Sequence, residues 1–418
     1  MTATLPAATD VLVVGAGPAG SAAAAWLARS GVDVLLTDAA TFPRDKTCGD
    51  GLTPRAIGEL LGLGLEDWLR AHTVNHGLRA HGFQQTLELR WPGGTLPDWG
   101  SAVPRTELDD HLRTVAIKSG ARAVDGVRAL GVRREGGRVA AVIFAVPPAG
   151  GADETVEVRC ERLVVADGVR SPLGKALGRE WHRDTVYGVA GRSYVASRRS
   201  DDPWISSHLE LRDQSGAALA GYGWIFPLGN GEVNLGAGTL ATAKRPAAVA
   251  IKPLMRHYAE QCRESFELDG ELRAQASALL PMGGAVSGVA GPNWALIGDA
   301  AACVNPLNGE GIDYGLETGR LVAETMLESS DLAEVWPALL RHHYGEAFSI
   351  ARRLAGLVTV PGILRYAGPP GMRSNALMTL ALRWMGNLVT DDDRDRAARV
   401  WRWMGRRSLA LDHRPPFT

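Results

Sequence analysis

The fold of this chain is decided near its start by the stretch Val14-Gly15-Ala16-Gly17-Pro18-Ala19-Gly20. An apolar run, residues 11–14, leads into it, and an alanine-rich run, residues 21–29, follows it. This order predicts a strand, a tight turn and a helix. Gly15 permits the tight turn, and Gly17 lets the backbone approach a diphosphate closely. Gly20 lets the helix pack on the strand. The helix N-terminus then faces the negative charge of the diphosphate.

An acidic residue ends the next predicted strand. Residues 32–37 are mostly apolar and lead to Asp38, which lies 23 residues after Gly15. A carboxylate at this point can bind the ribose of an adenosine. Strand, helix and terminal acid occur together, so the sequence predicts a nucleotide site. The residues expected to hold the cofactor there are Gly15, Ala16, Gly17, Pro18, Ala19, Gly20 and Asp38.

A second stretch, far downstream, indicates which nucleotide is bound. It reads Leu296-Ile-Gly-Asp-Ala-Ala-Ala-Cys-Val-Asn-Pro-Leu-Asn-Gly-Glu-Gly311, between a predicted strand at residues 294–297 and a predicted helix at residues 312–327. Asp299 can hold the ribityl hydroxyls of a flavin, and the positive end of the helix can face the edge of the ring where reduction deposits negative charge. An ordinary helix cap is the alternative role for Asp299. The two stretches together favour FAD over NAD as the resident cofactor.

Composition bears on several other classes of protein. The 45 basic and 46 acidic residues nearly cancel, whereas a nucleic-acid-binding protein needs a net basic face. The four cysteines show no C-x-x-C pair, so neither a disulfide scaffold nor a zinc site is expected. No metal is expected at His72, His76 and His81 either, because acidic and sulfur ligands are missing nearby; we expect surface histidines.

Hydropathy predicts the location of the chain. No apolar run approaches the ~18 residues of a membrane span. We therefore expect a cytoplasmic protein, with peripheral contact at the inner face of the cytoplasmic membrane as an additional expectation.

The middle of the chain changes its pattern twice. The elements expected first are a helix at residues 106–118, a strand at 121–132, a hairpin loop at 146–155 and a buried strand at 163–166. Residues 187–238 then alternate between apolar and polar positions, which predicts antiparallel strands that include 207–211, 223–226 and 232–237. A helical region begins near Pro337.

These patterns predict an α/β fold with three parts. A Rossmann-type FAD-binding domain is expected at residues 1–75, 101–180 and 288–336. An inserted substrate domain, an antiparallel β-sheet, is expected at residues 76–100 and 181–287. A C-terminal helical region is expected at residues 337–418.

The motifs, taken in order along nearly the whole chain, resemble those of the geranylgeranyl reductase family, flavoproteins of the p-hydroxybenzoate hydroxylase type. The matching segments are the first glycine stretch, Arg44-Asp-Lys-Thr-Cys-Gly-Asp-Gly51, Arg105, Asp167-Gly168, Tyr222-Gly-Trp-Ile-Phe-Pro227, Gly298-Asp299 and Asn308-Gly-Glu-Gly311. Residues 46–55 and 391–395 are most similar to the actinobacterial branch of this family, which saturates one double bond in the polyprenyl tail of menaquinone. The resemblance implies FAD, a prenylated quinone lipid as substrate, and NAD(P)H or another reductant as a transient electron donor, because no second G-x-G-x-x-G unit is present.

The resemblance also implies roles for single residues. Arg105 would contact the cofactor, with a surface role as the alternative, and Val127 would lie against the adenine. Asp167 would sit beside the cofactor, with a plain turn as the alternative. The segment that passes the flavin ring would be Cys48, Gly49, Asp50 and Gly51, and backbone N–H groups at its carbonyl edge would come from Gly311 and Ile312.

The implied chemistry needs an acid. A prenyl double bond has no electron-withdrawing group, so a proton must arrive before or with the hydride, in a dry slot. Cys48 is the candidate, because a thiol in an apolar site stays protonated; a structural thiol is the alternative. Tyr222, Trp224 and Phe226 are expected to line the slot, with core packing as their alternative.

The C-terminal region gives a further indication. Residues 354–364 are almost wholly apolar, and residues 372–418 hold nine arginines and five aspartates. A basic, partly amphipathic surface of this kind can rest on anionic lipid. A helical cap that packs on the core is the alternative.

Several other functions fit part of the sequence. A geranylgeranyl reductase for another prenyl lipid shares the motifs, and a flavin-dependent aromatic monooxygenase shares the Asp-Gly and Gly-Asp turns. A flavin halogenase shares part of its Trp motif with residues 221–227, but no lysine lies between Lys46 and Lys118 to activate hypohalous acid. A flavin- or quinone-binding protein without catalysis is a fourth alternative.

Overall fold

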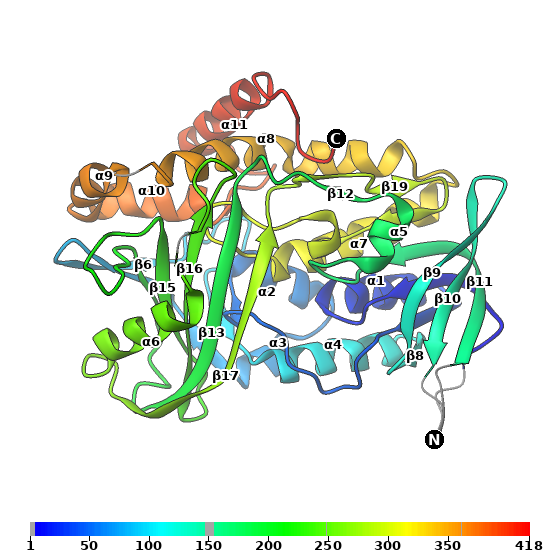
Figure 1. Cartoon of the computed structure of the whole chain (residues 1–418), viewed down its shortest axis with the longest axis horizontal. Helices are drawn as coiled ribbons and strands as arrows, with labels where there is room; N and C mark the ends of the chain where they lie inside the picture. The colour runs from blue at the N-terminus through cyan, green and yellow to red at the C-terminus, as the bar shows by residue number, and fades with distance from the viewer. Residues whose placement is uncertain (1–4, 147–153, 248, 361) are drawn as a thin grey trace.

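The structure is a computed structural model that describes residues 5–146, 154–247, 249–360 and 362–418. Most of the hairpin loop expected at residues 146–155 lies outside the described residues. Figure 1 shows a mixed sheet with its helices at one side, a second sheet beside it, and C-terminal helices along one edge.

The first sheet is built around the predicted glycine turn. Its strands run in the order β19 (Ala290–Gly291), β20 (Trp294–Leu296), β11 (Glu154–Val165), β1 (Ala8–Val14), β2 (Val34–Thr37) and β8 (Arg122–Val124). From β20 to β8 the pairs are parallel. β10 (Arg138–Val146) joins β11, and β9 (Arg128–Glu135) joins β10, both antiparallel. The carboxyl ends of β1, β2, β11 and β20 therefore meet at one edge, where an open α/β sheet binds its ligand.

Close backbone contacts explain why glycine is needed at positions 15 and 20. Gly15 has a φ of +104°, and a Cβ there would lie 2.2 Å from the Ala166 carbonyl oxygen. A Cβ at Gly20 would lie 1.8 Å from the Gly15 carbonyl oxygen. The first turn of α1 (Pro18–Arg29) is thereby held against β1 and the end of β11.

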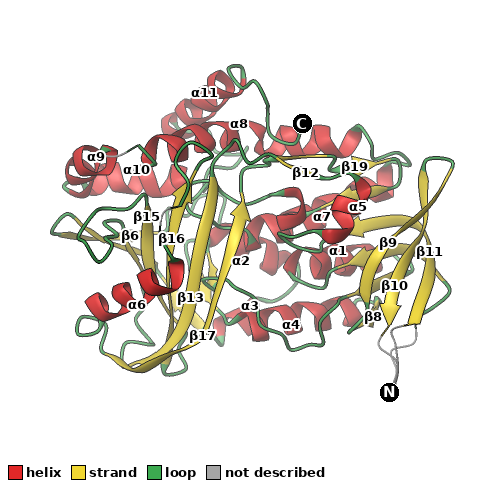
Figure 2. Ribbon diagram, viewed as in Figure 1, coloured by secondary structure: helices red, strands yellow, loops and turns green. Residues whose placement is uncertain are grey.

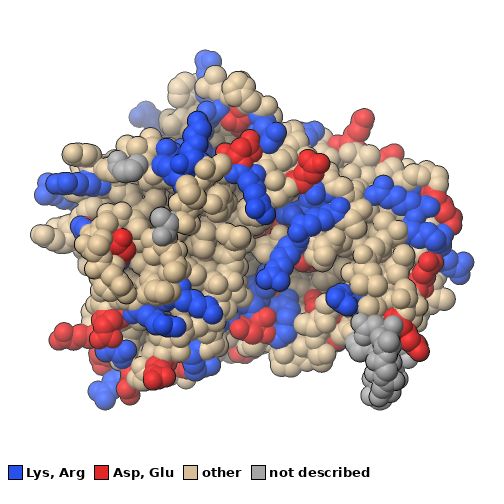
Figure 3. Space-filling view, in the orientation of Figure 1, with Lys and Arg blue, Asp and Glu red and all other residues tan. Residues whose placement is uncertain are grey.

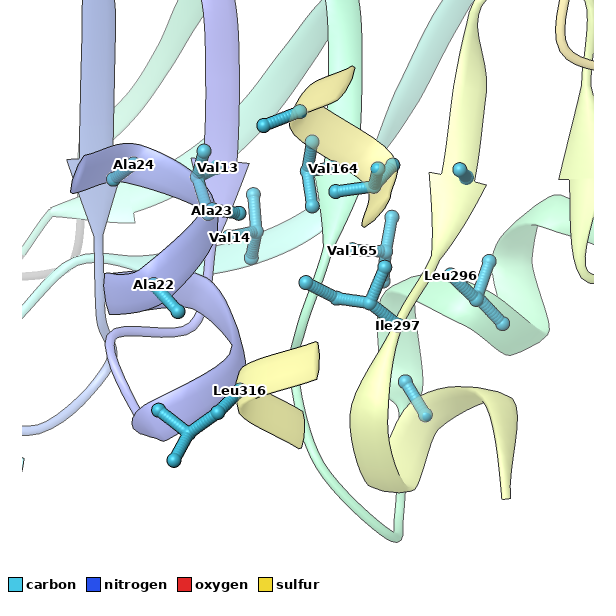
Figure 4. Packing of buried hydrophobic residues seen from close by; sticks show 14 of the residues in the cluster. Val13, Val14, Ala22, Ala23, Ala24, Val164, Val165, Leu296, Ile297 and Leu316 are labelled. Atoms are coloured by element: carbon cyan, nitrogen blue, oxygen red, sulfur yellow. The ribbon is translucent and has the colours of Figure 1, made fainter. Parts of the chain in front are cut away.

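The helices of the two motifs pack directly on each other. A Cβ at Gly319, in α7 (Ile312–Glu328), would lie 2.6 Å from the Ala19 carbonyl oxygen of α1, and a Cβ at Gly298 would lie 2.9 Å from the Ala19 Cβ. Valines of β1 and β11, alanines of α1 and Leu316 of α7 fill the adjoining core (Figure 4). The two stretches that the sequence separates so widely therefore form one unit.

The second sheet has strands in the order β17 (Leu268–Pro281), β13 (Tyr187–Ser197), β16 (Glu232–Ala241), β15 (Gly221–Pro227), β14 (Ile205–His208), β5 (Gly77–Gly82) and β6 (Gln85–Arg90). Its pairs are antiparallel except for β14 with β5, which is parallel. Helix α6 (Ile251–Cys262) packs on one face through Leu254, Met255 and Tyr258. The other face is turned toward the first sheet (Figure 2).

Smaller elements complete the chain. Short sheets are formed by β3 (Gly51–Leu52), β7 (Gly100–Ala102) and β4 (Thr73–Asn75), and by β12 (Glu180–Trp181) with β18 (Val286–Ser287). The remaining helices are α2 (Pro54–Gly62), α3 (Glu66–Arg70), α4 (Arg105–Lys118), α5 (Pro172–Leu177), the 3-10 helix Gly298–Ala301, α8 (Val335–Val358), α9 (Ile363–Met372), α10 (Asn375–Met385) and α11 (Arg396–Leu409).

Three local predictions were wrong. The single strand expected at residues 121–132 is two strands, β8 and β9, because Gly126 has a φ of +72° and turns the chain between them. The strand expected at residues 207–211 is Ile205–His208, after which the chain enters a loop closed by the Leu219 N–H and the Leu211 carbonyl. His81 is not a surface side chain: it is half-buried and stacks on His208 with ring centroids 4.4 Å apart.

Two further findings concern metals and membranes. The described residues contain no group of three or more His, Cys, Asp or Glu side chains suited to a metal ion. Within the same residues, no single helix has the length and apolar character needed to cross a bilayer; α8 and α9 meet that criterion only as a pair, which is bent by 112°.

Candidate active site

Two arginine side chains, Arg44 and Arg105, lie near the N-terminus of α1. This helix begins after Gly17 without a side-chain cap, so its first N–H groups are free to bind an anion. A Cβ at Gly17 would lie 3.3 Å from Arg44 Nη2. Arg44 Nη1 lies 2.7 Å from Asp109 Oδ2, and the buried Arg105 binds both oxygens of the same carboxylate at 2.7 Å. Two guanidinium groups and a helix dipole fit the charge of a diphosphate.

Asp38 and Val127 lie together beside the glycine turn. The Asp38 carboxylate accepts hydrogen bonds from the N–H groups of Ala16 and Ala40, each at 2.8 Å. The Val127 N–H donates to the Asp38 carbonyl oxygen at 2.9 Å. The backbone bonds fix the carboxylate beside the glycine turn and leave it lone pairs for a ribose hydroxyl.

Asp167 borders the glycine turn from the end of β11. Its carboxylate accepts hydrogen bonds from Ser171 Oγ at 2.6 Å and from the Leu173 N–H at 2.8 Å. Burial raises the pKa of Asp167. A Cβ at Gly15 would lie 3.1 Å from the Asp167 backbone nitrogen, so Asp167 adjoins the glycine turn while its side chain caps α5.

The second motif forms the opposite end of the site. α7 begins after Gly311 without a side-chain cap, and Ile312 is its first residue. A Cβ at Gly311 would lie 3.1 Å from Asp299 Oδ1, and Asp299 Oδ2 lies 3.3 Å from Lys46 Nζ. The acid, the free helix N-terminus and the segment around Lys46 are therefore neighbours.

The segment Cys48–Gly51 lies against the aromatic strand of the second sheet. A Cβ at Gly49 would lie 3.2 Å from both Phe226 Cε2 and Trp224 Nε1, and a Cβ at Gly51 would lie 3.0 Å from Phe226 Cε2. Glycine at both positions permits this approach. The contact joins the predicted flavin segment to the predicted substrate sheet.

The three aromatic side chains of β15 differ in availability. Tyr222 and Phe226 are half-buried, and the Tyr222 hydroxyl donates to the Asn308 carbonyl of the second motif. Trp224 is 6% exposed, and its Nε1 donates to Asn234 Oδ1 at 2.9 Å. Tyr222 and Phe226 can therefore face a ligand, whereas Trp224 is largely occupied by protein contacts.

Cys48 is held in a polar network. The Asp50 N–H points to its sulfur at 3.4 Å, and Asn234 Nδ2 donates to its carbonyl oxygen at 2.9 Å. Burial raises the pKa of the Cys48 thiol, and the nearby Arg105 guanidinium opposes that shift. The thiol is thus kept protonated, with a cation in reach of the thiolate that proton loss would leave.

Sequence reasoning missed several polar residues of the site. Arg44 lies inside a motif of the resemblance, but it was not predicted to bind the cofactor. Nothing in the sequence marked Asn234 as a site residue beyond its place in a predicted strand. Asp313 is 2% exposed, and neither of its buried carboxylate oxygens has a hydrogen-bond partner within the part of the chain that the structure describes. Burial raises its pKa. The sequence signal that could have pointed to the Asp313 carboxyl is the acidic turn Asn308-Gly-Glu-Gly311, which ends two residues before it.

Comparison with known proteins identifies a matching family, similar sequences and similar structures. Residues 8–329 match the FAD binding domain family. The chain is 60% identical to the menaquinone reductase of Mycolicibacterium smegmatis over 98% of its length and 99% of that protein. A geranylgeranyl bacteriochlorophyll reductase-like protein of Thermoplasma acidophilum matches with a TM-score of 0.70 and 21% identity, covering 97% of this chain and 96% of that one. A flavin-dependent brominase matches with a TM-score of 0.72 and 17% identity, covering 97% and 100%. The last two likenesses show the fold, an α/β FAD-binding fold with an added antiparallel sheet.

Proposed function

The chain belongs to the menaquinone reductases, a group of FAD-binding flavoproteins, and on that premise we propose that it saturates a double bond in the polyprenyl tail of menaquinone. The observation that supports the polyprenyl tail as the part that is reduced is the contact of Cys48–Gly51 with Trp224 and Phe226. It brings a thiol whose pKa is raised by burial next to an aromatic strand, and a proton donor in a dry slot suits the reduction of an alkene.

Residues on both sides of the site fit FAD. The diphosphate would be held by the α1 N-terminus, Arg44 and Arg105, and the adenosine by Asp38 and Val127. Asp299 and the α7 N-terminus after Gly311 would hold the flavin end, where Cys48–Gly51 would pass the ring. When bound and reduced, FAD supplies a hydride. The reductant would bind transiently, and NAD(P)H is the first candidate.

The protein's own side chains would supply the proton and the dry environment. Cys48 would give its proton to one alkene carbon while the other carbon receives the hydride. Arg105 would then stabilise the thiolate through its positive charge. Tyr222 and Phe226 would exclude water from the prenyl chain, and Trp224 would support Phe226 and Gly49 from behind.

The proposed function is tested by anaerobic incubation of the FAD-loaded protein with dithionite and menaquinone in detergent. We expect a product heavier by two hydrogens. Reduction of the quinone ring adds the same mass, so the product is reoxidised in air before mass analysis, which reverses ring reduction only. A retained gain of two hydrogens in the tail fragments supports the proposal. A gain confined to the ring, or a product that carries oxygen or halogen in aerobic assays, contradicts it.

We also propose that the C-terminal helices rest on an anionic membrane. Tyr366 of α9 is 78% exposed, and Trp403 of α11 is 54% exposed. The exposed face of α11 carries Arg396, Arg399, Arg406 and Arg407 around Val400 and Trp403. Figure 3 shows basic side chains over the part of the surface formed by α8, α9 and α11. Exposed apolar groups ringed by arginine suit a lipid headgroup layer.

Leu377 of α10 is also exposed, by 55%. Membrane contact predicts that the paired change Tyr366→Ser and Leu377→Ser weakens binding to phosphatidylglycerol vesicles. Two large side chains contribute roughly 3 kcal/mol when buried, so the affinity should fall about 100-fold in flotation assays. Leu130→Ser, in β9, removes a side chain that is 49% exposed and serves as the matched control. Truncation of the C-terminal helical region is a poorer test, because Phe417 packs in the main hydrophobic core and its loss would destabilise the fold. Equal flotation of both variants would remove the membrane from the proposal.

A further inference from the structure

Asp50 is the most deeply buried acid beside Cys48. Its side chain has no measurable exposure, and its φ of +63° lies in the left-handed region, which is unusual for a residue other than glycine. This backbone turn places the Asp50 N–H on the Cys48 sulfur at 3.4 Å. A strained, buried carboxyl next to a reactive group calls for a functional explanation.

Only one of the two Asp50 oxygens is satisfied by the protein. Oδ2 accepts hydrogen bonds from the Tyr194 hydroxyl at 2.7 Å and from Asn234 Nδ2 at 2.8 Å. Oδ1 is buried and has no hydrogen-bond partner among the described residues. An ionised carboxylate would leave that oxygen uncompensated, whereas a protonated one would carry its hydrogen there.

The charged and hydrogen-bonding groups around Asp50 come from three elements. Arg105 approaches from α4, Arg192 and Tyr194 from β13, and Asn234 from β16. Burial raises the pKa of Asp50 to about 6, against the opposing effect of these hydrogen bonds and guanidinium groups. The carboxyl can therefore both hold and release a proton near neutral pH.

We propose that Asp50 returns a proton to Cys48 after each reduction, and so acts on the reaction through that thiol as a positioning residue. The inference rests on the proposed reduction with Cys48 as the acid. In the reaction the Cys48 S–H bond breaks, a C–H bond forms at the alkene, and the reduced flavin supplies the hydride and both electrons. The Asp50 O–H bond then breaks, the Cys48 S–H bond re-forms, and Asp50 recovers its proton from solvent. The transient reductant, a hydride donor of the nicotinamide class, would supply the two electrons for the next turnover.

Electrostatics favour this direction of transfer. A thiolate at Cys48 beside an ionised Asp50 would place two negative charges in one buried pocket, which disfavours the pair. The buried thiol binds its proton more tightly than the carboxyl does, so transfer from Asp50 to the thiolate is downhill. Arg105 stabilises the single remaining charge on either group.

The decisive variant is Asp50→Asn, which keeps the shape and tolerates the left-handed backbone. With reduced FAD bound before menaquinone is added, the first turnover uses the proton already on Cys48. We therefore expect a burst of about one product per flavin at the normal rate, followed by steady-state turnover that is slowed about ten-fold or more. Equal slowing of the first and later turnovers, or an unchanged steady state, would overturn the proposal. Absence of tail reduction by the unmodified protein would instead contradict the proposed function.

A readout without turnover is the alkylation of Cys48 by iodoacetamide in the oxidised holoenzyme, followed by mass spectrometry. An ionised Asp50 raises the pKa of the thiol. Asp50→Asn should therefore speed labelling severalfold at about pH 8, and an unchanged rate counts against the electrostatic link.

Tyr194→Phe provides an independent test if Asp50→Asn fails to fold. The Tyr194 hydrogen bond lowers the pKa of Asp50, so its removal should raise that pKa. Where proton return limits turnover, the rate falls as pH rises through the pKa of Asp50. The alkaline limb of the pH–rate profile should thus move to higher pH in Tyr194→Phe. A limb that stays in place would also overturn the proposal.

Discussion

Replacement of Cys48 by alanine should lower the rate of tail reduction by about 10²–10⁴-fold, the range that a positioned general acid contributes. Without a proton donor beside it, the alkene does not develop the cation-like carbon that accepts the hydride. FAD binding should change little, because the diphosphate and adenosine contacts proposed for Arg44, Asp38 and the α1 N-terminus lie elsewhere. The measurement is the amount of tail-reduced product formed in a single turnover without oxygen, found by mass analysis after the quinone ring has been reoxidised in air.

Two comparisons make this result specific. Cys160→Ala, in β11, removes another buried thiol and should leave the rate unchanged. Cys48→Ser keeps the size of the side chain but offers a weaker acid, so it should also be slow. Full activity in Cys48→Ala would show that another group donates the proton, and it would remove the role proposed for Asp50 as well.

The glycine turn could be predicted from the sequence because its cause is local. Gly15, Gly17 and Gly20 act within one strand, one turn and one helix, so their spacing carries the structural requirement. The contact of α1 with α7 could be inferred only because one flavin cofactor would have to bind both motifs. The two motifs must therefore lie close together in the fold. Small residues such as Gly298 and Gly319 then explain how the two helices come so close.

The network around Cys48 could not be predicted in the same way. Tyr194 and Asn234 reach Asp50 because β13 and β16 pair with Tyr194 opposite Asn234, and that register depends on the whole second sheet. Arg105 and Asp109 are four residues apart on α4, but Arg44 reaches the same carboxylate only after α4 has packed beside the glycine turn. Such contacts arise from tertiary packing between distant segments, which leaves no periodic signal in the sequence.

Gly20→Val should have the other large effect, the loss of FAD binding together with reduced stability. The first added atom would lie 1.8 Å from the Gly15 carbonyl oxygen, 3.0 Å from the Gly15 carbonyl carbon and 3.2 Å from the Ala166 Cβ. No side-chain rotation relieves a clash between backbone atoms, so the start of α1 must move away from β1. We expect the free energy of unfolding to fall by about 3 kcal/mol, at the upper end of the usual cost of overpacking.

Movement of the α1 start would also displace the N–H groups that face the diphosphate, and we expect the Kd for FAD to rise at least about 100-fold, a loss of roughly 2.7 kcal/mol. Flavin fluorescence quenching on titration of the apoprotein measures the affinity, and thermal denaturation measures the stability. Gly356→Val is the matched control, because Gly356 also lies in a helix and a Cβ there meets no atom within 4 Å. If Gly20→Val bound FAD as tightly as Gly356→Val does, the α1 N-terminus could not be the diphosphate site, and the nucleotide would have to lie elsewhere on the sheet.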